Sequence, residues 1–315
     1  MASSSRTVKA NPASYLRKLQ AFKLFLYILP VIALIMVFYY LPLWGWSYAF
    51  FQYKPGKSLA DCAFVGWKNF YMLFENPVMR ANLIRVITNT FGIHFLGYLF
   101  SPLPMLFAVF LSELHSRKFQ KLTQTLTTLP HFISWVILFS LMFNLFSYQG
   151  IVNNLLISLN WIKDPIPFLA TEKHIWITQV LLQRWKETGW GAIVYFATIA
   201  GISPELYEAA MVDGAGRMRR IWHITLPHLI PTYFVLLIIS IGNFLNTGID
   251  QYMVFQNSLN KEHIEVLDLY VYNLGIGSGQ ISYSVAVGIM KSAVALVLFA
   301  FANRLSKQVR GESIF

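Results

Sequence analysis

The sequence predicts an all-α membrane protein whose chain crosses the bilayer six times. Hydrophobic residues make up 56% of the 315 positions and charged residues only 12%, against roughly 25% charged in a soluble domain. The apolar residues gather in six runs, each close to or above the roughly 20 residues that a helix needs to cross a bilayer. Lys and Arg gather on alternate sides of these runs, as they do in proteins of fixed membrane orientation.

The predicted spans divide the chain into a tail, a membrane domain and a second tail. Residues 1–21 are Ser-rich and basic, and we expect them to form a cytoplasmic tail. The first apolar run is too long for a signal-peptide core and no small-residue cleavage site follows it, so it should remain as an anchor. The membrane domain covers residues 22–305, and residues 306–315 form a cytoplasmic C-terminal tail. The spans are predicted at residues 22–46, 83–112, 129–147, 174–200, 228–249 and 282–303.

The placement of charge predicts the orientation in the membrane. A net charge of +11 could suggest nucleic acid, but fourteen Lys and Arg residues fall on the side of the two tails and seven on the other side. Cytoplasmic loops carry the excess of positive charge. We therefore expect a multi-pass protein of the bacterial cytoplasmic membrane, in contact with lipid, with both termini in the cytoplasm and with no nucleic-acid partner.

The sequence offers no set of residues for a metal or a catalytic centre. Cys62 is the single cysteine, which rules out an internal disulfide and a multi-cysteine metal cluster. The seven histidines are scattered, and His223 and His228 have no third ligand nearby. No G-x-x-x-x-G-K-[ST] sequence occurs, so ATP cannot be hydrolysed here by a phosphate loop. We expect no catalytic residue, no metal and no cofactor bound by this chain.

The loop between the fourth and fifth spans, within residues 203–227, carries the strongest functional pattern. Its segment from Glu208 to Met211 favours helix, and its small side chains allow close approach of a partner. Met211 adds a deformable apolar contact. Gly214 can adopt a positive φ and turn the chain between two short helices. The positions at fixed spacing are Glu208, Ala209, Ala210, Gly214, Ile224, Leu226 and Pro227.

This pattern resembles the EAA loop of the membrane subunits of binding-protein-dependent ABC importers. In that family the motif reads E-A-A, three residues, G, nine residues, I, one residue, L-P. Its two helices dock into a groove of the ATPase subunit, where the glutamate pairs with a basic residue. The resemblance implies a type I ABC importer permease fold with six transmembrane helices. It assigns ATPase coupling to Glu208, Ala209, Ala210, Met211, Asp213, Gly214 and Ala215.

The resemblance extends over about residues 22–305 and narrows the family to carbohydrate permeases. It rests on the segments 66–70, 128–135, 189–191, 268–272 and 302–304, which are similar to permeases for oligosaccharides and polysaccharides, alginate among them. Such a subunit is implied to pair with a second permease, which we expect to be a different chain. It is implied to work with two cytoplasmic ATPase subunits that hold ATP and Mg, and with an extracytoplasmic solute-binding protein that delivers the carbohydrate.

Polar residues of the predicted fifth span suggest a place where the cargo crosses. Ser240, Asn243, Thr247 and Asp250 are three or four residues apart, with Asn246 beside them, so we expect them to share one helix face. Such a face is costly in lipid unless it meets water or another helix. It could line the substrate pathway, or it could make hydrogen bonds between helices.

Charged residues within the spans form a second group of pathway candidates. Arg184, Lys186 and Glu187 lie near the middle of the fourth span and Lys291 lies in the sixth. We expect Arg184 to pair with Glu187, and Lys186 or Lys291 to meet a carboxylate on a neighbouring helix or to face the cargo. With Arg85, which should extend to the outer interface, cations outnumber anions in the spans. This excess favours an acidic cargo such as a uronate oligosaccharide.

Trp190 is the aromatic candidate for the pathway. Its indole offers a flat apolar face on which a pyranose ring could stack. It is equally suited to packing within the bundle or to the membrane interface. The sequence leaves both roles open.

Two other functional classes remain open from the sequence. A membrane-embedded enzyme for polysaccharide or lipid should show paired carboxylates or a histidine-rich metal set at membrane depth. A secondary transporter often contains an inverted internal repeat, and no such repeat is evident in the sequence. Uptake that survives ATP depletion but stops when an ion gradient collapses would identify a secondary transporter.

Overall fold

The protein is helical almost throughout, as predicted. We describe a computed structural model, which covers residues 12–170, 172 and 174–310. Within these residues the one β feature is an isolated antiparallel bridge between Phe51 and Phe64. Most of the predicted N-terminal tail and the last five residues of the chain lie outside the described part. Residues 12–21 continue the first helix, and residues 306–310 continue the last one.

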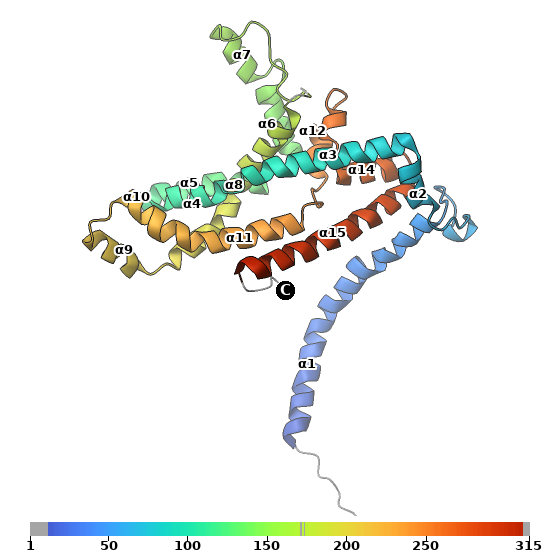
Figure 1. Ribbon diagram of the computed structural model, residues 1–315, viewed down its shortest axis with the longest axis horizontal. Coiled ribbons are helices and arrows are strands. Elements are labelled where there is room, and N and C mark those ends of the chain that lie inside the picture. Colours follow the sequence, from blue (N-terminus) through green and yellow to red (C-terminus); the bar gives the residue numbers. More distant parts are fainter. Residues whose placement is uncertain (1–11, 171, 173, 311–315) are drawn as a thin grey trace, which may run out of the picture.

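The first predicted span is a long, bent helix that projects away from the rest of the molecule (Figure 1). It comprises α1 (Pro12–Ile35), the π-helical turn η1 (Met36–Tyr40) and the 3₁₀ helix η2 (Leu41–Phe50). None of the most apolar stretch of this segment is buried within the chain. An apolar helix with this little internal contact requires lipid or a partner subunit around it.

Two short helices precede the second span. η3 (Leu59–Asp61) precedes α2 (Lys68–Glu75), and α3 (Pro77–Leu99) and α4 (Leu103–Ser112) make the second span. The helix begins six residues before the predicted boundary at residue 83. Asn76 explains this early start, because its side chain accepts hydrogen bonds from the amides of Val78 and Met79, and Pro77 occupies the first helical position.

The third predicted span is broken near its beginning. α5 (Arg117–Phe132) ends at Ile133, and Ser134 caps a new helix, α6 (Trp135–Phe146), by accepting a hydrogen bond from the amide of Ile137. α7 (Ile151–Ser158) follows. Figure 1 shows α6 and α7 standing away from the long body of the molecule. The predicted span 129–147 therefore contains the last turn of α5, the break and all of α6.

Six helical segments correspond to the six predicted spans. Five of them are long and apolar enough to cross a membrane, namely Lys23–Phe50, Pro77–Ser112, Trp135–Ser158, Arg217–Gly242 and Ile281–Phe301. The sixth is α8 (Ile175–Ala200), which has 26 residues. It falls outside that set because Arg184, Lys186 and Glu187 lie within it.

The fifth span begins earlier and ends earlier than predicted. α9 (Pro204–Val212) and α10 (Arg217–Arg220) precede η4 (Ile221–Thr225) and α11 (Leu226–Gly242). The helix stops at Gly242, seven residues before the predicted boundary. Asn, Thr and Gly follow this point, and these residues favour caps and turns over helix interiors. Gly248 has a φ of +70°, which a regular right-handed helix excludes.

The segment between the fifth and sixth spans folds back into the bundle. It forms α12 (Asp250–Phe255), α13 (Lys261–Ile264), α14 (Leu267–Tyr272) and the π-helical turn η5 (Asn273–Gly277), and α15 (Ile281–Arg310) follows. Tyr252, Ile264 and Leu269 from this segment are buried in a core with Ile93 of α3, Leu138 of α6 and Val180 of α8. The segment is thus part of the packed body.

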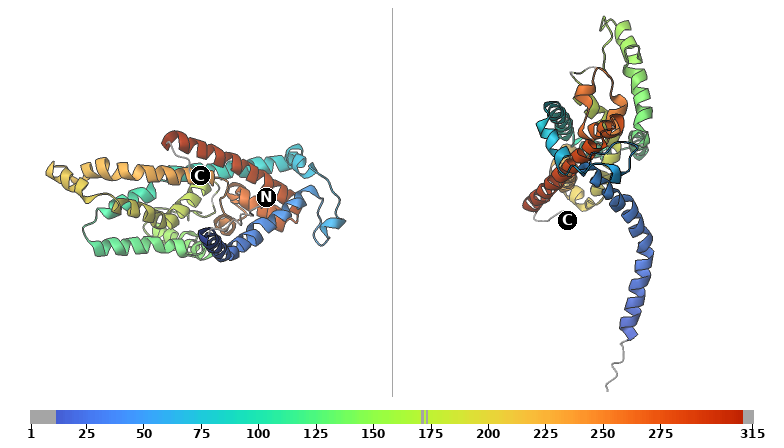
Figure 2. Two further views of the ribbon diagram at one scale, coloured as in Figure 1. Left: turned by 90° about the horizontal axis from the view of Figure 1, so that it is seen from below. Right: turned by 90° about the vertical axis from the view of Figure 1, so that its right-hand side faces the viewer.

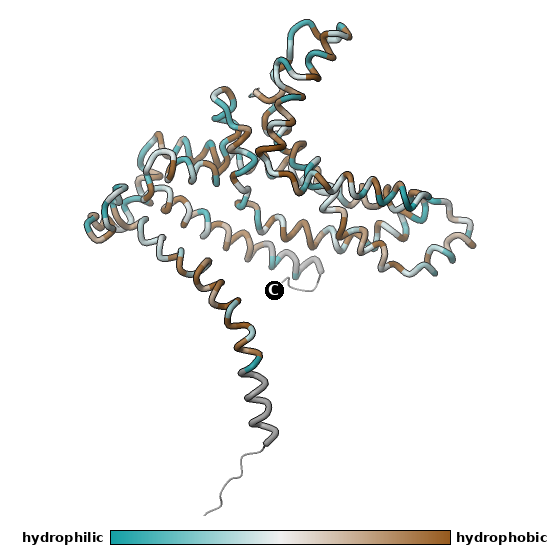
Figure 3. Tube along the Cα trace, turned by 180° about the vertical axis from the view of Figure 1, so that it is seen from behind, coloured by the Kyte–Doolittle hydropathy of each residue, from teal (hydrophilic) through white to brown (hydrophobic). Residues whose placement is uncertain are grey.

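The long helices run side by side in an elongated body (Figure 2), and apolar residues recur along most of them (Figure 3). Many large apolar side chains of these helices are exposed. The coupling loop α9–α10 lies at one end, and α2 with the beginning of α15 lies at the other (Figure 1). A core formed by α4, α8 and α11 supports the first end, with Met105, Ala192 and Leu229 buried in it. A core formed by η2, α2, α3, α14 and α15 supports the second end.

Candidate functional site

The predicted coupling loop consists of two short helices joined at Gly214. Gly214 has a φ of +74°, so its predicted positive φ is confirmed. The amide of Ala215 donates to the carbonyl of Ala210 at 2.8 Å, and the Gly214 amide donates to the carbonyl of Met211 at 3.1 Å. These bonds satisfy the last carbonyls of α9, as expected for a helix that ends in the left-handed conformation. Asp213 is the C-cap residue before this turn.

The surface of the coupling loop mixes apolar and charged side chains. Val212 is 88% exposed and Met211 is 52% exposed. Glu208, Ala209 and Asp213 are also exposed. The carboxylate of Glu208 is not in any of the ion pairs found among the described residues. An exposed apolar patch beside a free charge is typical of a surface that contacts another protein.

Contacts from distant segments hold the coupling loop on the bundle. Arg217 Nε lies 3.0 Å from Glu113 Oε2, and Arg217 Nη2 lies 3.1 Å from the Nδ1 atom of His115, just beyond α4. The hydroxyl of Tyr207 in α9 lies 3.0 Å from the hydroxyl of Thr225 in η4. These anchors tie both short helices to membrane helices. The sequence alone did not indicate the contacts of Arg217, because Glu113 and His115 lie about 100 residues away in the chain.

The polar residues of the predicted fifth span do not share one helix face, and that prediction is wrong. Asn243 is the C-cap of α11, and its side-chain amide donates to the carbonyl of Ile239 at 3.1 Å. Asn246 and Thr247 follow in the irregular segment 243–249, while Asp250 begins the next helix and is exposed. The physical reason is the early helix end at Gly242.

Asn243, Asn246 and Lys291 nevertheless come together at one cavity. This cavity has a volume of about 420 Å³ and lies between the end of α11 and α15. Asn246 Nδ2 lies 3.5 Å from Asn243 Oδ1. Trp46 of η2 and Ser292 of α15 also line it, and the sequence did not single out either residue. An indole, amides, a hydroxyl and an ammonium group can together stack on and hydrogen-bond to a sugar ring.

Lys291 meets a carboxylate on a neighbouring element, as one of the predictions expected. Its Nζ forms a short ion pair with Asp268 Oδ1 of α14. The second carboxylate oxygen of Asp268 accepts from the Thr247 amide at 2.9 Å and from the Thr247 hydroxyl at 3.0 Å. Thr247 thus belongs to a network that joins the irregular segment to α14 and α15.

Arg184 and Glu187 do not pair with each other, contrary to prediction. Glu187 Oε2 lies 2.9 Å from His131 Nδ1 of α5 instead. The guanidinium of Arg184 lies close to Gly97. A Cβ atom added to Gly97 would be 3.1 Å from Arg184 Nη2. Its Nε is buried and has no hydrogen-bond partner in the described structure.

The described residues include no group of three or more His, Cys, Asp or Glu side chains that could hold a metal.

Lys186 stabilises a helix end and does not meet a carboxylate. Its Nζ donates to the carbonyls of Pro130, His131 and Ile133 at 3.1, 2.6 and 2.9 Å. These carbonyls lie at the end of α5, where the helix can no longer provide donors. A cation is also favourable beside the negative end of a helix dipole. The Lys186 Nζ lies 5.5 Å from the ring centroid of Trp135 as well.

Trp190 has one face of its indole covered. The His131 ring stacks on it with 4.4 Å between centroids and 1° between planes. Trp190 is not among the residues of the 420 Å³ cavity, and neither are Arg184, Glu187 and Asp250. The substrate-pathway candidates of the sequence therefore fall into separate places in the fold.

Arg85 forms an ion pair with the segment between the fifth and sixth spans. Its Nη2 lies 2.7 Å from Glu265 Oε2, and its Nη1 donates to the carbonyl of Glu262 at 2.9 Å. Glu265 is buried, and its Oε1 accepts a hydrogen bond from the side-chain amide of Asn273 at 2.8 Å. Glu265 and Asp268 thus neutralise two of the membrane cations. The cation excess that favoured an acidic cargo is largely cancelled.

The chain matches known proteins over nearly its whole length. Residues 101–311, more than half of the chain, match the family described as "Binding-protein-dependent transport system inner membrane component". The chain belongs to this family. Its all-α fold is that of a type I ABC importer permease. It is thus a membrane-spanning transporter subunit.

Individual relatives of this permease carry names of carbohydrate transport systems. It is 40% identical over 294 residues to the polygalacturonan/rhamnogalacturonan transport system permease protein YteP of Bacillus subtilis. The aligned region covers 93% of this chain and 90% of that protein. It is 29% identical to the arabinooligosaccharides transport system permease protein AraP of the same organism, with 91% and 90% covered.

Solved structures agree with these relatives. A chain of a bacterial ABC transporter involved in import of the acidic polysaccharide alginate superimposes with a TM-score of 0.82 and 34% identity, covering 95% of this permease and 99% of that chain. A chain of a bacterial alginate transporter in complex with a periplasmic protein that holds an alginate pentasaccharide gives a TM-score of 0.81. It covers 94% of this permease and 97% of that chain, again at 34% identity.

Proposed function

We propose that this permease is one membrane subunit of an ATP-driven importer of oligosaccharides or polysaccharides, with an acidic saccharide as its cargo. It pairs with a second permease subunit of different sequence and with two cytoplasmic ATPase subunits that hold ATP and Mg. An extracytoplasmic binding protein delivers the saccharide. The chain lies in the bacterial cytoplasmic membrane with both termini in the cytoplasm.

The observation that carries the proposal is the coupling loop. Glu208 is exposed and in none of the ion pairs of the described residues. It lies beside exposed Met211 and Val212, in α9 at the end of the body opposite α2 (Figure 1). A free carboxylate next to an apolar patch suits a charge-assisted contact with a basic residue of an ATPase subunit. Because Arg217 and Tyr207 fix the loop to the bundle, movement of the ATPase would be transmitted to α4 and α11.

The 420 Å³ cavity supports a saccharide as the cargo. Asn243 and Asn246 provide donors and acceptors, and Trp46 provides a ring face. The acidic character of the cargo has its support in the relatives, one of which is named for polygalacturonan and another for alginate. Alternating access then requires two states of the bundle that differ in their contacts with the ATPase.

The proposal is tested by uptake into proteoliposomes that contain the permease, its partner permease, the ATPase and the binding protein. We expect uptake of trigalacturonate to require internal ATP and to persist when ion gradients are dissipated. Uptake that stops with the ion gradient but survives ATP depletion would identify a secondary transporter and overturn the proposal. Chemical change of the sugar without its accumulation would identify an enzyme.

The role of the cavity is tested by replacing Asn243 and Asn246 together with Leu. We expect slower saccharide uptake with assembly and basal ATPase activity retained, because the substitution removes hydrogen-bonding groups from the cavity wall and leaves the coupling loop intact. Asn154→Leu, on exposed α7, is the matched control and should transport as the wild type does. Loss of assembly in the double variant would show that the two amides have a structural role.

A further inference from the structure

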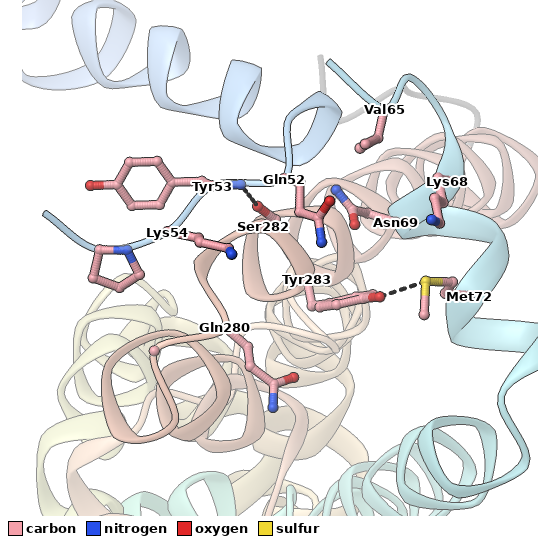
Figure 4. Close-up of a pocket in the computed structure, with 12 residues that line it drawn as sticks. Gln52, Tyr53, Lys54, Val65, Lys68, Asn69, Met72, Gln280, Ser282 and Tyr283 are labelled. Carbon is pink, nitrogen blue, oxygen red and sulfur yellow. Dashed lines mark hydrogen bonds between the residues drawn. The ribbon is translucent and has the colours of Figure 1, made fainter. Parts of the chain in front are cut away.

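A second pocket opens at the end of the molecule opposite the coupling loop. It has a volume of about 310 Å³, and we call it the outer pocket. Three segments form it, namely residues 52–55 after the first span, residues 65–72 around the start of α2, and residues 279–283 at the start of α15 (Figure 4). The first span ends at Phe50 and the last begins at Ile281, so the pocket lies where both spans leave the membrane on the same side.

The walls of the outer pocket are cross-linked by hydrogen bonds. The Gln52 amide donates to the carbonyl of Ala63 at 2.9 Å. The Tyr53 amide donates to the Ser282 hydroxyl at 3.0 Å, and this hydroxyl donates to the carbonyl of Phe51 at 2.7 Å. The side-chain amide of buried Asn69 donates to the carbonyl of Ala49 at 2.7 Å. These bonds fix the backbone around the pocket before a ligand binds.

Two lysines and two glutamines line the outer pocket. Lys54 and Lys68 line it on opposite sides, and Gln52 and Gln280 also line it (Figure 4). Neither lysine is in any of the ion pairs of the described chain, and no Asp or Glu lines the pocket. Both lysines and both glutamines are exposed and can rotate onto a ligand. This composition suits an anionic ligand that also carries hydroxyl groups.

The remaining lining suits the less polar face of a sugar ring. Pro55, Val65 and Met72 provide apolar surface beside the lysines. The hydroxyl of Tyr283 donates to the sulfur of Met72 at 2.6 Å, which leaves the phenol oxygen free to accept a hydrogen bond from a sugar hydroxyl. The pocket volume lies at the lower end of the range for small-ligand sites, which is about 300 Å³.

We propose that the outer pocket is an entry subsite that binds one carboxylate-bearing sugar unit of the cargo, through Lys54 and Lys68. This inference rests on the proposed function as a saccharide importer. The carboxylate pairs with the two ammonium groups, the amides of Gln52 and Gln280 bind ring hydroxyls, and the apolar wall covers a C–H face. A carboxylate side chain of the docked binding protein is the competing occupant. It has no ring hydroxyls for the two glutamines and would fill less of the volume.

The subsite is tested by zero-length cross-linking in the assembled importer loaded with trigalacturonate through its binding protein. A water-soluble carbodiimide joins a carboxylate to a lysine only when the two are in contact, and peptide mass spectrometry locates the new amide. We expect galacturonate on Lys54 or Lys68 and none on Lys57, an exposed lysine of the same loop outside the pocket. Cross-links from Lys54 or Lys68 to Asp or Glu of the binding protein would overturn the proposal in favour of a docking contact.

A second measurement separates this inference from the proposed function. Uptake of trigalacturonate by the wild-type importer is measured first. If the wild type does not take it up, both the proposed cargo and the subsite are refuted. With wild-type uptake established, Lys54→Gln with Lys68→Gln should raise the half-saturating concentration about fivefold while the maximal rate is kept, since two ion pairs at an exposed site are lost. Lys57→Gln should leave it unchanged. Unaltered half-saturation in the double variant would overturn the subsite and leave the transport function standing.

Discussion

Single residues in this permease do different work although the sequence presents them alike. Glu187 lies within a span and its carboxylate contacts His131 at 2.9 Å. Glu208 lies in the coupling loop, is exposed, and takes part in no ion pair among the residues that the structure describes. Lys186 and Lys291 are both membrane lysines, but one caps the end of α5 and the other pairs with Asp268. The role of each charged group follows from the partner that the fold brings to it.

Charge reversal at Glu208 should uncouple the permease from its ATPase. We expect Glu208→Lys to lower transport-coupled ATP hydrolysis tenfold or more, because an attractive contact with a basic residue becomes repulsive. ATP hydrolysis stimulated by the loaded binding protein is the measurement. Glu205→Lys, on the first turn of the same helix, tests whether any charge reversal in α9 has this effect and should keep most of the activity. Normal coupling in Glu208→Lys would contradict the assignment of the loop.

Removal of the Lys291 charge should destabilise the bundle. Lys291→Met leaves Asp268 without its cation. Breaking a buried ion pair lowers the free energy of unfolding by about 3–5 kcal/mol. The two side chains are 16% and 17% exposed, so the loss here should be smaller. The midpoint of thermal unfolding in detergent should fall. Combining Lys291→Met with Asp268→Asn should restore much of the loss, since Asn can still accept from Thr247. A double variant no more stable than the single one would show that the pair itself contributes little.

At the scale of elements, the breaks between helices position the site more than the helices do. The end of α11 at Gly242 places Asn243 and Asn246 at the cavity, and the break between α5 and α6 exposes the carbonyls that Lys186 satisfies. The left-handed turn at Gly214 ends α9 before α10 begins. Each break occurs where Gly, Asn, Ser or Pro interrupts the helix.

The turn at Gly214 should resist a β-branched residue. No atom lies within 4 Å of the place where a Cβ would be, so Gly214→Val would suffer only backbone strain, about 1–2 kcal/mol at a φ of +74°. We expect weaker assembly with the ATPase, measured by co-purification. Gly214→Asn should be tolerated better, because Asn adopts this conformation more readily. Gly216→Val is the matched control, since Gly216 has equal space and a φ of −66°. Equal assembly of all three variants would refute the proposed strain.

At the scale of the whole molecule, the two functional ends lie far apart. The coupling loop is at one end of the body, and α2 and the start of α15, which contribute to the outer pocket, are at the other (Figure 1). The buried segment 250–277 fills the interior between α3 and α8 and carries Glu265 and Asp268 to the membrane cations. Conformational change at one end must therefore pass through a packed bundle to reach the other.

The orientation of the molecule can be tested with its single cysteine. Cys62 is half-buried in the loop after the first span, which we place outside the cell. A membrane-impermeant maleimide should label it in intact protoplasts. In a Cys62→Ser background, Met211→Cys should be labelled only after the membrane is opened, because the coupling loop is placed inside. Labelling of Met211→Cys in intact protoplasts would reverse the orientation.

The sequence by itself determined the all-α class, the approximate positions of the spans and the left-handed turn at Gly214. These features depend on local properties, namely the length of apolar runs, helix propensity and the conformational freedom of glycine. The family follows from the same local motif and from similarity along the chain.

Only the tertiary structure decided the partners of the membrane charges and the residues of the two cavities. Arg85, Lys186, Glu187 and Lys291 meet groups on other elements, and spacing along one helix cannot show which ones. Trp46 joins Asn243 at one cavity although about 200 residues separate them in the chain. Packing of segments far apart in sequence decides such contacts, because each charge in a low-dielectric interior pairs with the nearest group that the fold provides.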